Sequence, residues 1–186
     1  MPLISESYRA QQQKLHESSD YGTIGETYGP LVGKIMDKLE VTHLLDYGCG
    51  HNLSLLKSLK VNHKFKYQAY DPGVEKYASL PVPAEMVVCL DVLEHIEPEN
   101  IDDVLDHLET LTEAVGVFTV CTVPANKTLD DGRNAHLIQR PAEWWLPRFM
   151  CRFDLQTFQK TDESGFFVIV NAMTRHIEDT NGAKLA

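Results

Sequence analysis

The chain has 186 residues, of which 43% are hydrophobic and 24% are charged, and its formal net charge is -10. This size and composition predict one globular domain, and the acidic balance disfavours extended nucleic-acid binding, although a local basic patch could hold a nucleotide or a nucleic-acid end. No apolar run is long enough to cross a bilayer, so no membrane partner is expected.

The N-terminus and the cysteines favour a cytoplasmic location. Residues 1–6 have neither the basic start nor the apolar centre of a secretory signal. The cysteines are far apart in the sequence, and no two of them have the close spacing of a zinc knuckle. Free thiols in a reducing compartment are therefore expected at Cys49, Cys89, Cys121 and Cys151.

Residues 1–29 are mostly polar and predict an N-terminal arm in front of the main domain. Within the arm, residues 5–16 favour one helix and residues 20–25 favour a loop. The arm could lie passively on the domain or act as a lid over a ligand. The main domain is expected over residues 30–176, and residues 177–186 are expected to form a loose tail.

A glycine turn after the first predicted strand is the main ligand-binding feature of the sequence. Leu44 and Leu45 indicate a buried strand, and Asp46, Gly48 and Gly50 follow it directly. Glycine lets the backbone approach a ligand closely, and the N–H groups of the next helix point at the same place. The third glycine of the dinucleotide pattern G-x-G-x-x-G is missing, and the Asp46 carboxylate would repel a pyrophosphate. The turn therefore predicts a nucleoside site without a diphosphate, for which S-adenosylmethionine is the obvious candidate.

The chain from Pro30 onward alternates between predicted helices and strands. This alternation predicts an α/β, Rossmann-like, doubly wound sheet that is mainly parallel and ends in an antiparallel hairpin. A ligand of such a sheet lies beyond the carboxyl ends of the strands. Besides the first strand and its turn, we expect helices at 30–39, 53–59, 74–80, 98–115 and 141–149, strands at 65–70, 86–90, 117–123, 153–160 and 166–173, and a polar loop at 125–140.

Two further strand ends place acidic side chains at the same edge of the sheet. Asp71 follows the second strand at the spacing where a doubly wound fold positions an acid on ribose hydroxyls. Its alternative role is that of a turn aspartate before Pro72. Leu90 and Asp91 end the next buried strand, so they would border the same ligand.

The glycine turn, Asp71 and the strand end at Leu90-Asp91 together resemble the class I S-adenosylmethionine-dependent methyltransferases over about residues 30–173. The resemblance implies that the turn surrounds the methionine part of the cofactor and that Asp71 binds the ribose. It also implies a third strand with an adenine-contacting loop, but only residues 72–85 are available for it. The third strand is therefore expected to be shortened or lost. The candidate cofactor-binding residues are Tyr21, Asp46, Gly48, Cys49, Gly50, Asp71, Pro72, Leu90 and Asp91.

A group of acids and histidines lies beyond the strand that ends at Leu90. Asp91, Glu94, His95 and, in a later loop, His136 could hold a divalent cation such as Mg²⁺, Mn²⁺ or Zn²⁺. This set is similar to that of the metal-dependent small-RNA 3′-terminal 2′-O-methyltransferases, and its Val-Leu-Glu-His-Ile segment also resembles the ubiquinone-biosynthesis O-methyltransferases. Alternatively, Glu94 and His95 fix the loop without a metal, and His136 acts as a general base.

The segment 127–152 is richer in bases than in acids and contains two adjacent tryptophans. Arg133 is a candidate for binding a phosphate, and Trp144 is a candidate for stacking on an aromatic or sugar acceptor. The alternative is that both tryptophans pack against the terminal hairpin. The basic residues are Lys127, Arg133, Arg140, Arg148 and Arg152, against the acids Asp130, Asp131 and Glu143.

These features predict a cytoplasmic, S-adenosylmethionine-dependent methyltransferase that acts on an oxygen or nitrogen of a small molecule or a nucleotide. One alternative is a terminal RNA 2′-O-methyltransferase with a divalent metal. The other is a catalytically silent module that binds S-adenosylmethionine and regulates a partner.

Overall fold

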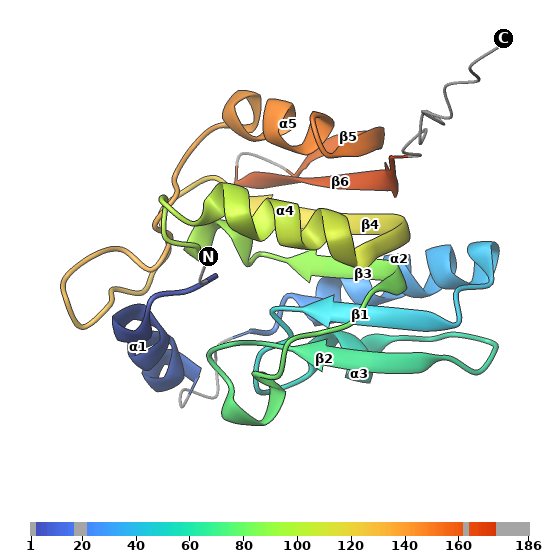
Figure 1. Cartoon of the computed structure of the whole chain (residues 1–186), viewed down its shortest axis with the longest axis horizontal. Coiled ribbons are helices and arrows are strands. Elements are labelled where there is room, and N and C mark those ends of the chain that lie inside the picture. Colours follow the sequence, from blue (N-terminus) through green and yellow to red (C-terminus); the bar gives the residue numbers. More distant parts are fainter. Residues whose placement is uncertain (1–2, 17–21, 162–163, 174–186) are drawn as a thin grey trace, which may run out of the picture.

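The computed structural model describes residues 3–16, 22–161 and 164–173, which form a single six-stranded sheet with helices on both faces (Figure 1). The strands are β1 (His43–Tyr47), β2 (Lys66–Tyr70), β3 (Ala84–Leu90), β4 (Thr112–Cys121), β5 (Phe153–Thr161) and β6 (Gly165–Ala172). The helices are α1 (Glu6–His16), α2 (Gly25–Leu39), α3 (Ser54–Ser58), α4 (Ile101–Leu111) and α5 (Ala142–Met150), with two 3-10 turns, η1 (Glu75–Tyr77) and η2 (Leu93–His95).

The strand order is β2-β1-β3-β4-β6-β5. The first four strands in this order pair in parallel, whereas β6 pairs antiparallel with both β4 and β5. This confirms the predicted doubly wound sheet with a terminal antiparallel hairpin. The segment 71–83 between β2 and β3 contains η1 but no strand, so β2 is the edge strand. The expectation that the third strand is shortened or lost is therefore confirmed.

Strand β3 explains how the two faces of the sheet acquire their cores. Its side chains alternate, so that Met86 and Val88 pack against α2 and α3, while Val87 and Cys89 pack against α4 and α5. All four side chains are fully buried. Burial of each large apolar side chain contributes about 1.5–3 kcal/mol, which is why a continuous apolar run becomes the centre of the sheet.

Helix α2 begins earlier than the sequence suggests. It starts at Gly25, with Pro30 inside it, so the predicted start at Pro30 is wrong, and the expected boundary between arm and domain falls within the helix. Three glycines, Gly25, Gly29 and Gly33, face α3 and the residues after it. A Cβ on Gly29 would lie 2.0 Å from the Ser58 hydroxyl oxygen, and one on Gly25 would lie 2.2 Å from the Leu55 nitrogen. Close packing of the two helices thus outweighs the low helix propensity of glycine.

Helix α4 and strand β4 follow each other without a loop. Helix α4 starts at Ile101 and not at Pro98, and β4 begins at Thr112, immediately after the helix ends. Val115 was expected in the helix but lies in β4. Its spacing from Leu111 fits a helix, but its apolar neighbours fit a strand equally well, so the sequence pattern did not distinguish the two. The predicted helix at 74–80 is reduced to η1.

The segment between η1 and β3 is bonded to a side chain of β2. The Gln68 side chain donates from Nε2 to the Val82 carbonyl at 2.9 Å and accepts from the Val82 nitrogen at 3.4 Å.

Among the described residues, no helix is both long enough and apolar enough to cross a membrane. All four cysteines are free thiols, as expected.

Candidate functional site

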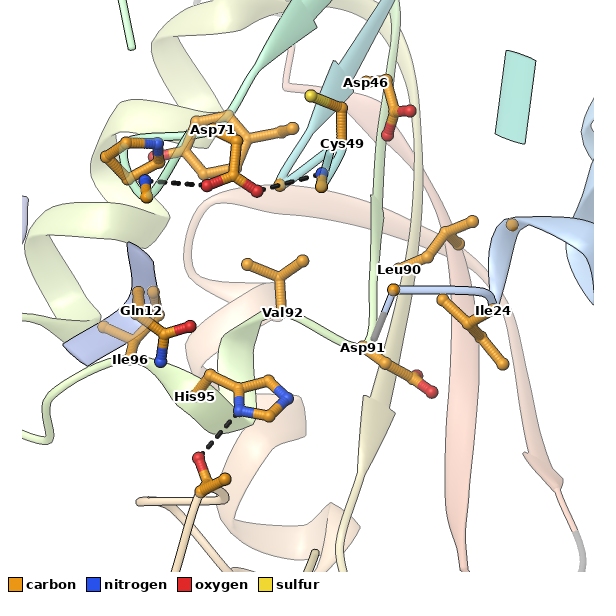
Figure 2. A pocket seen from close by; sticks show the side chains of 18 of the residues that line it. Gln12, Ile24, Asp46, Cys49, Asp71, Leu90, Asp91, Val92, His95 and Ile96 are labelled. Carbon is orange, nitrogen blue, oxygen red and sulfur yellow. Dashed lines mark hydrogen bonds between the residues drawn. The ribbon is translucent and has the colours of Figure 1, made fainter. Parts of the chain in front are cut away.

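A cavity of about 400 Å³ lies at the carboxyl ends of β1, β2 and β3 (Figure 2). Its walls come from the glycine turn, the start of α3, the segments after β2 and β3, helix α1, residues 22–27 and the loop 125–136. Tyr21 lies outside the described residues. All the other candidate cofactor residues line the cavity, namely Asp46, Gly48, Cys49, Gly50, Asp71, Pro72, Leu90 and Asp91.

The turn after β1 requires glycine for two reasons. Gly48 and Gly50 have φ angles of 80° and 60°, which residues with a side chain adopt only at a cost in free energy. In addition, a Cβ on Gly48 would lie 2.3 Å from a methyl carbon of Val92. The turn is tied to the end of β2, because the Gly48 and Cys49 nitrogens both donate to the Tyr70 carbonyl, at 2.7 and 3.1 Å.

Asp71 is buried and fastens two backbone segments. Its Oδ2 accepts from the Gly50 nitrogen at 3.0 Å, and its Oδ1 accepts from the Gly73 nitrogen at 2.8 Å. A carboxylate oxygen can accept more than one hydrogen bond. Asp71 can therefore hold the glycine turn and accept hydrogen bonds from the hydroxyl groups of a ligand at the same time.

Asp46 is almost completely buried behind the turn, where it accepts a hydrogen bond from the Tyr67 hydroxyl. Burial, with a smaller contribution from the charge of Asp71, raises the pKa of Asp46 to about 7. A cationic group in the cavity would favour the ionised carboxylate.

Asp91 stands at the end of β3 in a left-handed conformation, with a φ of 49°. Its carboxylate accepts from the Thr119 hydroxyl at 2.6 Å, and its nitrogen donates back to the same hydroxyl oxygen at 2.8 Å. These bonds hold Asp91 to β4 in a conformation that aspartate tolerates better than most residues. Burial raises the pKa of its carboxyl group.

Three of the four predicted metal ligands come together. Glu94, His95 and His136 each offer one ligand atom, and these atoms lie within 4.8 Å of one another, whereas Asp91 is not part of this group. Glu94 is fully buried: its Oε1 accepts from the Cys121 nitrogen at 2.9 Å, and its Oε2 has no hydrogen-bond partner among the described residues. Burial raises the pKa of Glu94 well above its usual value.

The two histidines of this group are oriented by backbone carbonyls. Nδ1 of His95 lies 2.7 Å from the Ala135 oxygen, and Nδ1 of His136 lies 2.6 Å from the Val123 oxygen. A carbonyl can only accept, so each Nδ1 carries a hydrogen, and in the neutral ring Nε2 then carries the lone pair. Metal-binding histidines commonly show this arrangement, and so do histidines that accept protons.

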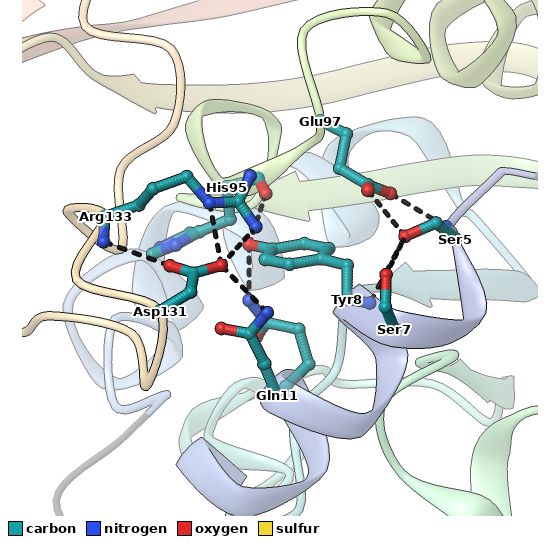
Figure 3. Close-up of polar contacts among 9 residues, drawn as sticks. Ser5, Ser7, Tyr8, Gln11, His95, Glu97, Asp131 and Arg133 are labelled. Carbon is teal, nitrogen blue, oxygen red and sulfur yellow. Dashed lines mark hydrogen bonds and ion pairs between the residues drawn. The ribbon is translucent and has the colours of Figure 1, made fainter.

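Helix α1 forms the outer wall of the cavity through contacts that the sequence did not indicate. The Tyr8 hydroxyl donates to the His95 carbonyl at 2.6 Å, and the Ser5 nitrogen and hydroxyl donate to the Glu97 carboxylate at 2.7 and 2.6 Å (Figure 3). Tyr8 and Gln12 are buried and line the cavity. Burial raises the pKa of Tyr8, which keeps its hydroxyl protonated. The only sequence signal for this role was an apolar tyrosine within a polar helix.

The two candidate acceptor-binding residues do not line the cavity. Arg133 donates to the Asp131 carboxylate at 2.7 Å, and its guanidinium lies 5.7 Å from the centre of the Tyr8 ring. Trp144 is half-buried against the core of the α4 and α5 face, with the guanidinium of Arg148 3.7 Å from its ring centre. Trp145 is fully buried in the same core.

A parallel sheet in this order, with a glycine turn after β1 and an acid after β2, defines a Rossmann-like nucleoside-binding fold. Residues 24–164 match the methyltransferase domain family, and the chain belongs to this family. It is a class I S-adenosylmethionine-dependent methyltransferase. No curated protein matches the sequence.

Solved structures with the same fold include enzymes for very different acceptors. A Burkholderia thailandensis 1,6-didemethyltoxoflavin-N1-methyltransferase is 13% identical, with 93% of this chain and 92% of that chain covered and a TM-score of 0.63. The magnesium protoporphyrin IX methyltransferase of Synechocystis PCC 6803, with bound S-adenosylmethionine, is 16% identical, with 81% of each chain covered and a TM-score of 0.55. The 16S rRNA methylase ArmA is 16% identical, with coverage of 87% and 91% and a TM-score of 0.54.

Proposed function

We propose that this methyltransferase acts on an oxygen or nitrogen of a small molecule or a nucleotide. The observation that carries the proposal is one cavity of about 400 Å³ in which the glycine turn and Asp71 lie together with His136. A cavity of this size, with α1 across its outer side, suits the cofactor and a compact acceptor. The neighbours named for a toxoflavin precursor and a porphyrin support a small acceptor, although the fold itself does not decide between acceptors.

In this proposal the cofactor lies along the carboxyl ends of β1, β2 and β3. Its methionine part contacts the turn from Asp46 to Gly50, where the Asp46 carboxylate favours a cation. Its ribose hydroxyls donate to Asp71, beside Pro72. Leu90 and Asp91 border the sulfonium end, close to the histidines.

The chemistry needs alignment and one proton acceptor. A lone pair of the acceptor attacks the methyl carbon while the carbon–sulfur bond breaks and its electron pair stays on sulfur, leaving S-adenosylhomocysteine. The protein mainly aligns these atoms. A hydroxyl or protonated amine must also lose a proton, and the Nε2 lone pair of His136 is suited to accept it.

A divalent cation at Glu94, His95 and His136 is a second element of the proposal. It is supported by the buried Glu94 Oε2, which has no partner among the described residues, and by the two carbonyl-oriented imidazoles. A cation there would keep Glu94 ionised and polarise an acceptor hydroxyl. Asp91 is bonded to Thr119 and is left out of this ligand set.

The alternative acceptor, an RNA terminus, finds less support. Three of the predicted basic residues are paired with acids of the chain: Arg133 with Asp131, and both Arg148 and Arg152 with Asp102. Bases that are neutralised in this way release few counterions on a phosphate backbone, so they contribute little to binding.

The free thiols support the cytoplasm as the location of the protein. Two of the four cysteines, Cys49 and Cys89, are buried, and none forms a disulfide. Proteins of reducing compartments keep their cysteines in this state.

The function is tested in two steps. Calorimetry should detect binding of S-adenosylhomocysteine, and failure to bind at millimolar concentration would sink the proposal. A screen with methyl-labelled S-adenosylmethionine and panels of small-molecule, nucleotide and short RNA acceptors should then show transfer to a small acceptor. Transfer only to RNA favours that alternative, and no transfer at all favours the silent module. His136→Ala should lower transfer at least tenfold, whereas His63→Ala, which changes a ring outside the cavity, should not.

The metal is tested separately with Mn²⁺. Calorimetry should show binding to the wild-type chain and at least tenfold weaker binding to Glu94→Gln, which removes a charged ligand. Glu99→Gln is the matched control, because Glu99 is exposed on the same segment. Equal Mn²⁺ affinity of wild type and Glu94→Gln would remove the metal from the proposal.

A further inference from the structure

The cavity has one end whose occupant the glycine turn does not identify. Figure 2 shows Asp46, Leu90 and Asp91 on one side, Gln12 and Ile96 on the other, and Asp71 and Val92 between them. If Asp71 holds the ribose and the methionine part lies toward Asp46, the base must extend toward Gln12. Ile96 lies beside Gln12 there and Val92 adjoins them, and such apolar side chains suit the faces of a purine (Figure 2).

The missing third strand leaves this end of the cavity without the wall that a longer sheet would supply. The segment after Asp71 turns through Pro72 and Gly73 into η1 and provides only one side. Helix α1 lies across the opening instead, and it brings Tyr8 and Gln12 into the lining. The purine edge would therefore meet a side chain of α1.

The orientation of the Gln12 carboxamide follows from a chain of hydrogen bonds. Tyr8 donates its only hydroxyl hydrogen to the His95 carbonyl, so the Tyr8 oxygen can only accept from Gln12. Gln12 must present its Nε2 to Tyr8, which it does at 2.5 Å. Its Oε1 then points into the cavity, toward Val92 (Figure 2). Without this chain the amide could turn over and present a donor.

We infer that Gln12 binds the adenine of the cofactor, with Oε1 accepting a hydrogen bond from the exocyclic amine, and that Tyr8 is the positioning residue that fixes the amide. The inference rests on the proposed cofactor site. It means that α1 replaces the missing strand as the base-recognition element. A helix of the N-terminal arm thus selects the cofactor as well as enclosing it.

The test compares ligands that differ only at the purine 6-position. Calorimetry is run with S-adenosylhomocysteine and with its analogue that carries hydrogen in place of the amine. The wild-type chain should bind S-adenosylhomocysteine about tenfold more tightly, as expected for one buried hydrogen bond. Gln12→Leu should bind both ligands with similar affinity. Gln11→Leu is the matched control, since Gln11 is the preceding residue but its amide donates to Asp131, outside the cavity, and it should keep the wild-type ratio.

Tyr8→Phe provides a second test that hardly changes the shape of the core. Without the Tyr8 oxygen, Gln12 is free to present its amide hydrogens, so binding of S-inosylhomocysteine, which has an acceptor at the 6-position, should improve several-fold relative to S-adenosylhomocysteine. If the wild type binds S-adenosylhomocysteine but neither variant changes the ligand ratios, the inference is wrong. If the wild type binds none of these ligands, the proposed function itself fails.

Discussion

Two opposite walls of the cavity, that of the glycine turn and that of α1, are built in different ways. The wall of the glycine turn is held by backbone hydrogen bonds from Gly48 and Cys49 to Tyr70 and by Asp71, all from neighbouring strand ends. The wall of α1 is held by side chains, and its partners are distant in the sequence: Ser5 and Glu97 are 92 positions apart. The first wall is therefore an intrinsic part of the sheet, whereas the second depends on a few contacts that can be removed one at a time.

The strongest way to break the turn wall is Gly48→Ala. The left-handed backbone costs about 1–2 kcal/mol for a residue with a side chain, and the contact at 2.3 Å with Val92 adds to it. We expect affinity for S-adenosylhomocysteine to fall about a hundredfold by calorimetry. Gly132→Ala is the matched control, because Gly132 has a φ of 87° but no neighbour within 4 Å of its Cβ position. Equal losses of affinity in both variants would contradict a specific role of the turn in binding.

The buried carboxylate of the turn wall should give the unliganded protein an unusual pH dependence. The pKa of Asp46 is about 7 in the folded state, against an ordinary value of 3.8. Between these values the folded protein holds a proton that the unfolded chain has released. Asp46 therefore lowers stability as pH rises through this window, by about 1.4 kcal/mol per pH unit at most.

Asp46→Asn tests this dependence, since asparagine does not titrate. When melting temperatures are measured from pH 5 to pH 8, that of the wild type should fall relative to that of the variant. The fall should be about 2–4 °C for each 1 kcal/mol lost from the free energy of unfolding. Asp91 and Glu94 also have raised pKa values, but they are present in both proteins and cancel in the comparison. If the melting temperatures of the two proteins change equally with pH, Asp46 is already ionised at pH 5.

The α1 wall is the easier one to loosen. Glu97→Ala removes the carboxylate that accepts both hydrogen bonds from Ser5. We expect amide hydrogen exchange in α1 to become about tenfold faster, because a lost buried partner costs about 1–3 kcal/mol locally. Exchange in β1 and β3 should not change. Glu99→Ala, at an exposed position nearby, serves as the control, and equal exchange in α1 of both variants would show that Ser5 does not anchor the helix.

The same contrast explains what could be predicted from the sequence. The glycine turn, Asp71 and the buried strand β3 are local patterns, and the structure has them where they were expected. The wrong helix start at Pro30 has a tertiary cause, because the glycines of α2 are packed against α3. The role of α1 could not be predicted either, since nothing near Ser5 or Tyr8 indicates Glu97 or His95 as a partner.

The candidate acceptor side shows a similar limit. Of the four residues that were grouped from their places at the sheet edge, Glu94, His95 and His136 lie together and Asp91 does not, because topology brings residues to one edge without setting their exact positions. Arg133 and Trp144 were selected for their chemistry, but both lie outside the cavity. Arg133 is hydrogen-bonded to Asp131, and the guanidinium of Arg148 lies over the Trp144 ring. Local composition does not reveal which charges are already paired.

Loss of the third strand also bears on how a second chain could pair with the sheet. An edge strand such as β2 is a template on which a second chain can add and begin to aggregate. The segment that is bonded to the Gln68 side chain of β2 contains Val82, which is flanked by Pro81 and Pro83. Proline has no N–H to donate, so this segment beside β2 is a poor template for a further strand.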